Sequence, residues 1–121
     1  MTKLEQQQSE VKEILEYCKT KYDNEPAVLL DRLTMLNVYL ARSGELKANI
    51  QFLYDLQQDK EINTLSVTDL QPMKLREVLK GKLALENYAL NLADRLNATI
   101  VHQIDSIRSQ LSYMKTELNN S

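Results

Sequence analysis

The sequence is poor in the residues that build disulfides, metal sites and phosphate-binding loops. It contains one cysteine, one histidine, two glycines, two prolines and no tryptophan among 121 residues. A single cysteine, Cys18, excludes an internal disulfide and a cysteine-based zinc site. One histidine supplies too few ligands for a transition metal, and two isolated glycines cannot form a phosphate-cradling loop. We therefore expect neither a metal nor a cofactor.

Strong net charge and long apolar runs are also missing. The 15 Lys and Arg residues nearly balance the 17 Asp and Glu residues, which leaves a net charge of −2. This balance provides no general attraction to DNA or to anionic lipid. No apolar run approaches the roughly 20 residues that span a bilayer, and the polar start of the chain, Met1–Glu10, does not resemble a secretory signal. We expect a cytoplasmic protein that binds neither DNA nor membranes.

What the chain does contain is an abundance of helix-forming residues, arranged with helical periodicity. The pattern predicts a single all-α domain over residues 1–121, with helices at about 3–22, 26–58 and 70–118. Between the last two lies a connector, Asp59–Leu70, in which Ser66 or Thr68 is expected to cap the following helix. A short connector makes these helices antiparallel neighbours, so we predict a long helical hairpin with an extra N-terminal helix.

The second half of the longest predicted helix carries an unbroken apolar seam. Its members recur at steps of three and four: Ala93, Leu96, Ile100, Ile104, Ile107, Leu111, Met114 and Leu118. Counting residues along the hairpin places Arg42 level with residues 86–88. The N-terminal end of the second helix then lies opposite about Ile104. The seam beyond that level then lacks cover from its own chain. We therefore predict a homo-oligomeric helical bundle with this interface: Ile104, Ile107, Leu111, Met114 and Leu118.

Arg42 interrupts an apolar stripe on the second helix, and two interpretations compete. We favour a structural role, in which Arg42 pairs with Glu86 or extends its charged end to water. In the alternative, Arg42 joins Tyr39 and Ser43 in a polar pocket that binds a phosphate or carboxylate through the arginine fork.

A second polar group lies on the long predicted helix. It comprises Arg95, His102, Arg108 and Tyr113, and His102 lies about 200° around the helix from Ile100. We favour a solvated outer face for this group. The alternative is a ligand pocket between subunits, since two arginines, an aromatic ring and hydrogen-bonding side chains suit a ribose-and-phosphate molecule.

Enzymatic motifs are absent from the sequence. Cys18 lies on the apolar stripe of the first helix with no evident base beside it, which indicates a packing residue. The carboxylates show no spacing typical of a catalytic pair. The locally basic run Met73–Lys82 lacks interleaved aromatic residues and is a weak nucleic-acid signal. We predict that the protein is not an enzyme.

Two segments carry a resemblance to other proteins. The first is Tyr39–Leu46, which leads to Leu53-Tyr54-Asp55, and the second is Val101–Lys115. Together they resemble small, uncharacterised helical proteins encoded by phages and prophages, particularly of gut bacteria. The resemblance covers about half the chain and supplies no catalytic residues. It implies a protein made in the cytoplasm of an infected bacterium.

Phage proteins of this kind suggest two main functions for the chain, of which the first is our working hypothesis and the second is its competitor. The first is a counter-defence sponge, an oligomer that sequesters a small anionic nucleotide-type signal through these residues: Tyr39, Arg42, Ser43, Arg95, His102, Arg108 and Tyr113. The second is a protein–protein interaction module, either a virion component or an inhibitor that grips a host protein. A purely structural coiled-coil spacer is a third possibility, in which Arg42 and His102 are freely replaceable.

Overall fold

The computed structural model describes residues 1–66 and 70–120, and the regular secondary structure of these residues is helical. Its four helices are α1 (Lys3–Lys19), α2 (Pro26–Leu65), α3 (Pro72–Lys82) and α4 (Ala84–Asn120). The described residues include no strand, so the all-α prediction is confirmed. None of the helices among these residues combines the length and apolar character that a membrane crossing requires.

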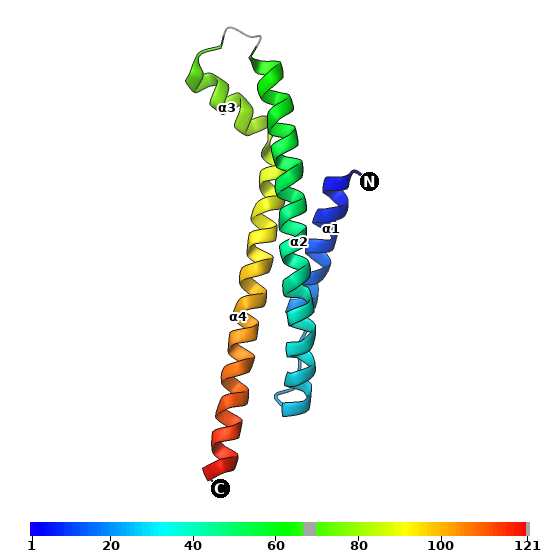
Figure 1. Cartoon of the computed structure of the whole chain (residues 1–121), viewed down its shortest axis with the longest axis vertical. Helices are drawn as coiled ribbons and strands as arrows, with labels where there is room; N and C mark the ends of the chain where they lie inside the picture. The colour runs from blue at the N-terminus through cyan, green and yellow to red at the C-terminus, as the bar shows by residue number, and fades with distance from the viewer. Residues whose placement is uncertain (67–69, 121) are drawn as a thin grey trace.

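The two longest helices form the body of the molecule. Figure 1 shows α2 and α4 side by side with opposite chain directions, and this pair makes the most extensive contact in the structure. The shorter α1 packs against both of them, and α3 lies beside the C-terminal end of α2. The molecule is therefore a three-helix body, formed by α1, α2 and α4, with a short helix at one end.

The core lies where α1, α2 and α4 meet. Its fully buried side chains include these residues: Val11, Leu29, Leu36, Leu46, Ile50, Leu96, Ile100 and Ile107. Burial of each large aliphatic side chain is worth roughly 1.5–3 kcal/mol. In contrast, α3 contributes no buried residue. The three-helix body therefore holds nearly all the apolar packing.

Local hydrogen bonds define both ends of α1. Thr2 and Glu5 form a capping box, in which each side chain accepts a hydrogen bond from the other residue's backbone N–H. At the other end the Thr20 hydroxyl donates to the carbonyl of Tyr17 at 2.6 Å. The helix ends at Lys19 instead of the predicted residue 22, and the backbone of Thr20 is extended, with φ −67° and ψ 141°.

The second helix is longer than predicted. It continues past Gln58 to Leu65, and Ser66 terminates it instead of starting the next helix. The Gln57 side-chain amide donates to the Glu61 carboxylate one turn later at 2.9 Å, and Leu65 is buried. These contacts support a segment that has no clear apolar periodicity. The other predicted cap, Thr68, lies outside the described residues.

The single long helix predicted over residues 70–118 is divided in two at Leu83. This residue adopts φ −101° and ψ 12°, between α3 and α4. Gly81, two residues earlier, weakens the helix because glycine loses the most conformational freedom on folding. The break lets the chain change direction while Leu83 is buried, with 3% of its surface exposed.

The break and the longer α2 together change which residues of α2 and α4 lie level. The Asn97 side-chain amide donates to the Ser43 hydroxyl at 3.2 Å, so these two residues are level. Lys47 pairs with Asp94 at 2.6 Å, one turn further along. The prediction placed Arg42 level with residues 86–88 of α4. The register therefore differs by about ten residues, or about 15 Å at 1.5 Å per residue.

This register overturns part of the predicted oligomer interface. Ile104 and Ile107 are buried within their own chain, because α2 reaches further along α4 than the count from the sequence allowed. Leu111 and Met114 are half-buried against the same core. Only the last turns of α4 extend beyond the start of α2 (Figure 1), and Leu118 there is 74% exposed.

Candidate functional site

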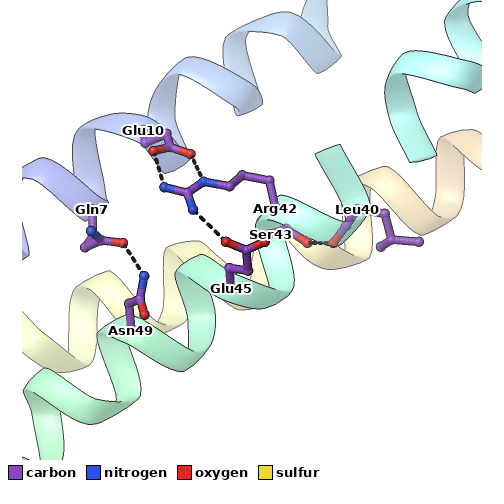
Figure 2. Close-up of polar contacts among 7 residues, drawn as sticks. All are labelled: Gln7, Glu10, Leu40, Arg42, Ser43, Glu45 and Asn49. Carbon is purple, nitrogen blue, oxygen red and sulfur yellow. Dashed lines mark hydrogen bonds and ion pairs between the residues drawn. The ribbon is translucent and has the colours of Figure 1, made fainter. Parts of the chain in front are cut away.

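Arg42 forms a surface ion-pair cluster that joins α1 to α2. Its guanidinium binds both carboxylate oxygens of Glu10 on α1, with the Nη2–Oε1 distance at 2.7 Å. The Nη1 atom donates to Glu45 Oε2 at 2.8 Å, one turn along α2. Figure 2 shows the guanidinium between the two carboxylates, with the Asn49–Gln7 hydrogen bond further along the same pair of helices. Arg42 therefore has two anionic partners within its own chain.

The ion-pair cluster shifts the pKa of both main partners. The hydrogen bonds from Arg42 lower the pKa of the Glu10 carboxyl, against a smaller opposing effect of desolvation. The two carboxylates in turn raise the pKa of Arg42. The predicted Arg42–Glu86 pair is wrong, because the register places Glu86 elsewhere. One Glu86 carboxylate oxygen is buried with no hydrogen-bond partner in the described structure.

Ser43 and Tyr39 are occupied by internal contacts. Ser43 is fully buried, where its hydroxyl donates to the Leu40 carbonyl at 2.8 Å and accepts from Asn97. The Tyr39 ring packs against the Tyr17 ring of α1, with 4.8 Å between centroids and an interplanar angle of 58°. Since Arg42 is paired as well, the three residues predicted to form an anion pocket do not form one within a single chain.

The second predicted group lies on the outer surface of α4. Arg95, His102, Arg108 and Tyr113 are all exposed. At 100° per residue, Arg95, His102 and Tyr113 fall within about 20° of one another, and Arg108 is about 120° from His102. Among the described residues these four side chains have no hydrogen-bond or ion-pair partner. The outer face of α4 is therefore polar and open, and it is separate from the Arg42 cluster.

The most tightly bound charged residue is Arg32, which the sequence analysis did not single out. It is 7% exposed, and its guanidinium binds the end of α1. The Nη1 atom donates to the Thr20 hydroxyl at 2.8 Å, and Nη2 donates to the carbonyls of Tyr17 at 2.9 Å and Cys18 at 3.2 Å. Nη2 also lies 3.3 Å from the Gln103 side-chain oxygen of α4. One side chain thus connects all three helices of the body.

Two aromatic rings and a helix end replace a carboxylate partner for Arg32. Its guanidinium carbon lies 4.2 Å from the centroid of Tyr17 and 4.6 Å from that of Tyr22. The carbonyls it binds lie in the last turn of α1, at the negative end of the helix dipole. Together these groups compensate a buried positive charge. A signal was present in the sequence, because Arg32 lies one turn before the buried Leu36 on a mainly apolar helix.

Burial around Arg32 keeps the neighbouring titratable groups neutral. Desolvation raises the pKa of the Cys18 thiol and of the Tyr17 hydroxyl, although Arg32 opposes both shifts. A raised thiol pKa reduces the fraction of reactive thiolate. The Gln103 side-chain amide also donates to the Cys18 carbonyl at 2.6 Å. This region is suited to packing and not to nucleophilic chemistry.

Two hollows in the surface do not contain the predicted ligand-binding residues. The larger, of about 720 Å³, lies between the start of α2 and the end of α4, and is lined by Pro26, Met114, Glu117, Leu118 and Asn120. The other, of about 520 Å³, lies between α1, α2 and the start of α4 and includes Leu4, Leu53 and Glu86. Among the described residues no group of three or more His, Cys, Asp or Glu side chains could hold a metal ion.

A third apolar stripe runs along the outside of α2, opposite the core. Two other apolar stripes are evident from the periodicity of the sequence, namely Leu29-Leu33-Leu36-Leu40 and Val28-Met35-Tyr39-Leu46-Ile50-Leu53, whereas Thr34 and Glu45 interrupt this one. We call it the outer stripe, and it consists of these residues at steps of three and four: Leu30, Thr34, Val38, Ala41, Glu45, Ala48, Phe52 and Leu56. Its four large apolar side chains are between 50% and 62% exposed. No described helix covers it.

Comparison with known proteins yields no relatives for this chain. No protein-family model, no curated protein and no solved structure matches it.

Proposed function

We propose that this protein is a non-enzymatic helical binding protein that assembles with itself and acts through protein–protein contacts. In this proposal α2 and α4 form an antiparallel hairpin, and with α1 they make a rigid support that presents the outer stripe. The outer stripe is the observation that carries the proposal. The resemblance of the chain to small phage and prophage proteins supports a role in the cytoplasm of an infected bacterium, as a virion component or as an inhibitor of a host protein.

The exposed outer stripe and the internally paired anion-binding residues together favour protein–protein contact over the binding of a small ligand by one chain. Contiguous apolar side chains along a helix of a small protein are typical of interaction sites. The predicted anion-binding residues, in contrast, have internal partners: Arg42 binds Glu10 and Glu45, and Ser43 is buried. A protein that uses helical surfaces needs no polar pocket and no catalytic group.

Sedimentation velocity from about 1 to 200 μM protein tests the self-association directly. We expect the average mass to rise with concentration, because an exposed apolar stripe gains free energy when a partner covers it. An average mass that stays that of one chain over this range would refute the proposed homo-oligomer.

Sequestration of a nucleotide-type signal is the second candidate function. The exposed residues Arg95, His102 and Tyr113 share the outer face of α4 and have the chemistry to bind phosphate, ribose and base. A second copy would have to complete this pocket, since one helix face does not enclose a ligand.

Calorimetric titration with cyclic dinucleotides and ADP-ribose derivatives separates the two functions. The interaction module predicts no saturable heat with any of them. Saturable heat that disappears in both Arg95→Ala and His102→Ala, but persists in Arg42→Ala, would establish sequestration on α4 instead.

A further inference from the structure

The outer stripe has an internal symmetry that indicates what covers it. Its members lie in pairs at equal distances on either side of Ser43: Leu30 with Leu56, Thr34 with Phe52, Val38 with Ala48, and Ala41 with Glu45. A two-fold interface brings the same surface of two copies together, so residues equidistant from the axis face each other. An α2–α2 contact with opposite directions therefore matches every position of the stripe.

We propose that a second copy of this chain covers the outer stripe, with the two α2 helices antiparallel and the two-fold axis level with Ser43. This inference rests on the proposed self-association and names the surface and register that it uses. Phe52 then faces Thr34 and Val38 faces Ala48, so a larger side chain meets a smaller one. Such alternation lets side chains interdigitate in the central part of the contact, while Leu30 and Leu56 face each other at its two ends.

Charge at the centre of the stripe is compatible with this register. Glu45 faces Ala41 of the second copy, so the two Glu45 carboxylates do not oppose each other. Within its own chain Glu45 accepts a hydrogen bond from Arg42 at 2.8 Å. Arg42 is one position from the axis, which places it within one helical turn of Glu45 of the second copy. The single acidic residue of the stripe therefore lies near two guanidinium groups in the dimer.

Free space at the centre permits close approach of the helices. A Cβ atom added to Gly44 would meet nothing within 4 Å, so the surface beside the axis is open. Ala41 and Ala48 flank the same level and carry only a methyl group. Small residues at a helix crossing allow a shorter distance between the axes.

The size of the outer stripe predicts a weak dimer. From Leu30 to Leu56 it is about 40 Å long, and a helix face is about 10 Å wide, which gives about 400 Å² on each copy. A stable complex usually buries about 800 Å² on each partner. We expect a reversible dimer that forms over the micromolar range and not a permanent assembly.

Disulfide cross-linking between two different variants tests the register. We expect a mixture of Val38→Cys and Ala48→Cys to form a mixed disulfide under mild oxidation. Each variant alone should form none, because like positions in the antiparallel dimer are about 15 Å apart along α2. A disulfide requires Cα atoms about 4.4–6.8 Å apart. The wild type, whose Cys18 is buried, is the control for background. Cross-linking of each variant with itself would show parallel helices and overturn the register.

A matched pair of valine substitutions tests whether the outer stripe is the surface that contacts the second copy. Val38 and Val101 are both exposed, on the outer stripe and on α4 respectively. Val38→Lys should shift the monomer–dimer midpoint at least tenfold towards higher concentration in sedimentation velocity, whereas Val101→Lys should leave it unchanged. Both variants should retain the helical circular dichroism of the wild type.

The outcomes separate failure of this inference from failure of the proposed function. If the wild type associates and Val38→Lys associates equally well, another surface forms the assembly and only the inference is overturned. If the wild type remains a monomer at every concentration, the proposed self-association and the inference are both overturned.

Discussion

The two arginines of α2 show that charge buried in a helical protein need not be charge paired with a carboxylate. Arg32 is almost fully buried and binds two carbonyls, a hydroxyl and two aromatic rings. Arg42, ten residues later, is at the surface and binds two carboxylates. Arg32 therefore secures the three helices to one another, while Arg42 adds a surface contact between two of them. The same residue type serves two roles because α1 ends beside one and runs past the other.

A similar contrast between a buried region and an exposed one holds along the whole of α2. Buried side chains of α2 are concentrated from Leu29 to Ile50, where α1 and α4 are both in contact with it. Beyond that level α2 meets α3, which has no buried residue. We therefore expect the three-helix body to determine stability and the α3 end to contribute little.

The largest expected effect comes from a truncation inside the body. Leu96→Ala should lower the free energy of unfolding by about 2–5 kcal/mol, because it leaves a cavity at a fully buried position. Leu79→Ala on α3 is the matched control and should cost less than about 1 kcal/mol, since Leu79 is only half-buried. Urea unfolding followed by circular dichroism measures both. Equal losses would show that the α3 end is as important as the body.

Removal of Arg32 should have the next largest effect. Arg32→Met should cost about 2–4 kcal/mol, because it removes the hydrogen bonds from Arg32 to the end of α1 and the contacts with two aromatic rings in a buried site. Arg32→Lys retains the charge but loses the planar fork and the stacking on Tyr17 and Tyr22, so it should recover only part of the loss. Arg42→Met should be much milder than either. If Arg42→Met proves the more damaging, the contrast between the two arginines is incorrect.

The smallest effect concerns Glu10 and depends on pH. Arg42 lowers the pKa of Glu10 below its usual value of 4.5, so the carboxylate stabilises the folded protein above that value. The contribution is lost as the pH falls through the lower, folded-state pKa. Wild type should therefore be slightly more stable than Glu10→Gln at pH 7, and the difference should fade towards pH 3. Thermal unfolding at both pH values measures it; a difference that grows on acidification would contradict the assigned sign.

The helical character of this chain could be predicted from sequence because it depends on local properties. Few glycines and prolines, strong helix formers and steps of three and four decide which segments are helical. The seam of α4 was identified correctly as an apolar face, since Leu96, Ile100 and Ile107 are fully buried. Each of these predictions needs only the residues of one segment.

The relative register of the helices was not predictable in the same way. The helix breaks at Leu83, and α2 continues for several residues beyond its predicted end, up to Leu65. Together these two differences shift α4 along α2 by about ten residues, or about 15 Å. This displacement brings Ile104 and Ile107 under cover. It also gives Arg42 the partner Glu10 from α1 instead of Glu86 from α4. Errors of a few residues at two helix ends add up along a pair of packed helices.

The candidate site was harder to predict than the fold, since exposure depends on the other helices. Val38 and Phe52 are ordinary helix residues in the sequence, and they form an outer stripe only because α1 and α4 both lie on other sides of α2. Arg32 likewise becomes a central contact only once α1 ends beside it. Sequence patterns mark both positions, but tertiary packing decides their roles.

Radical footprinting of the native protein at two concentrations tests most directly whether α2 is the surface that a second copy covers. Phe52 on the outer stripe and Tyr113 on α4 are both more than 60% exposed in the single chain, so both should be oxidised in dilute protein. In concentrated protein we expect the oxidation of Phe52 to fall several-fold while that of Tyr113 stays constant. Protection of Tyr113 with unchanged oxidation of Phe52 would place the contact on α4 and contradict the account.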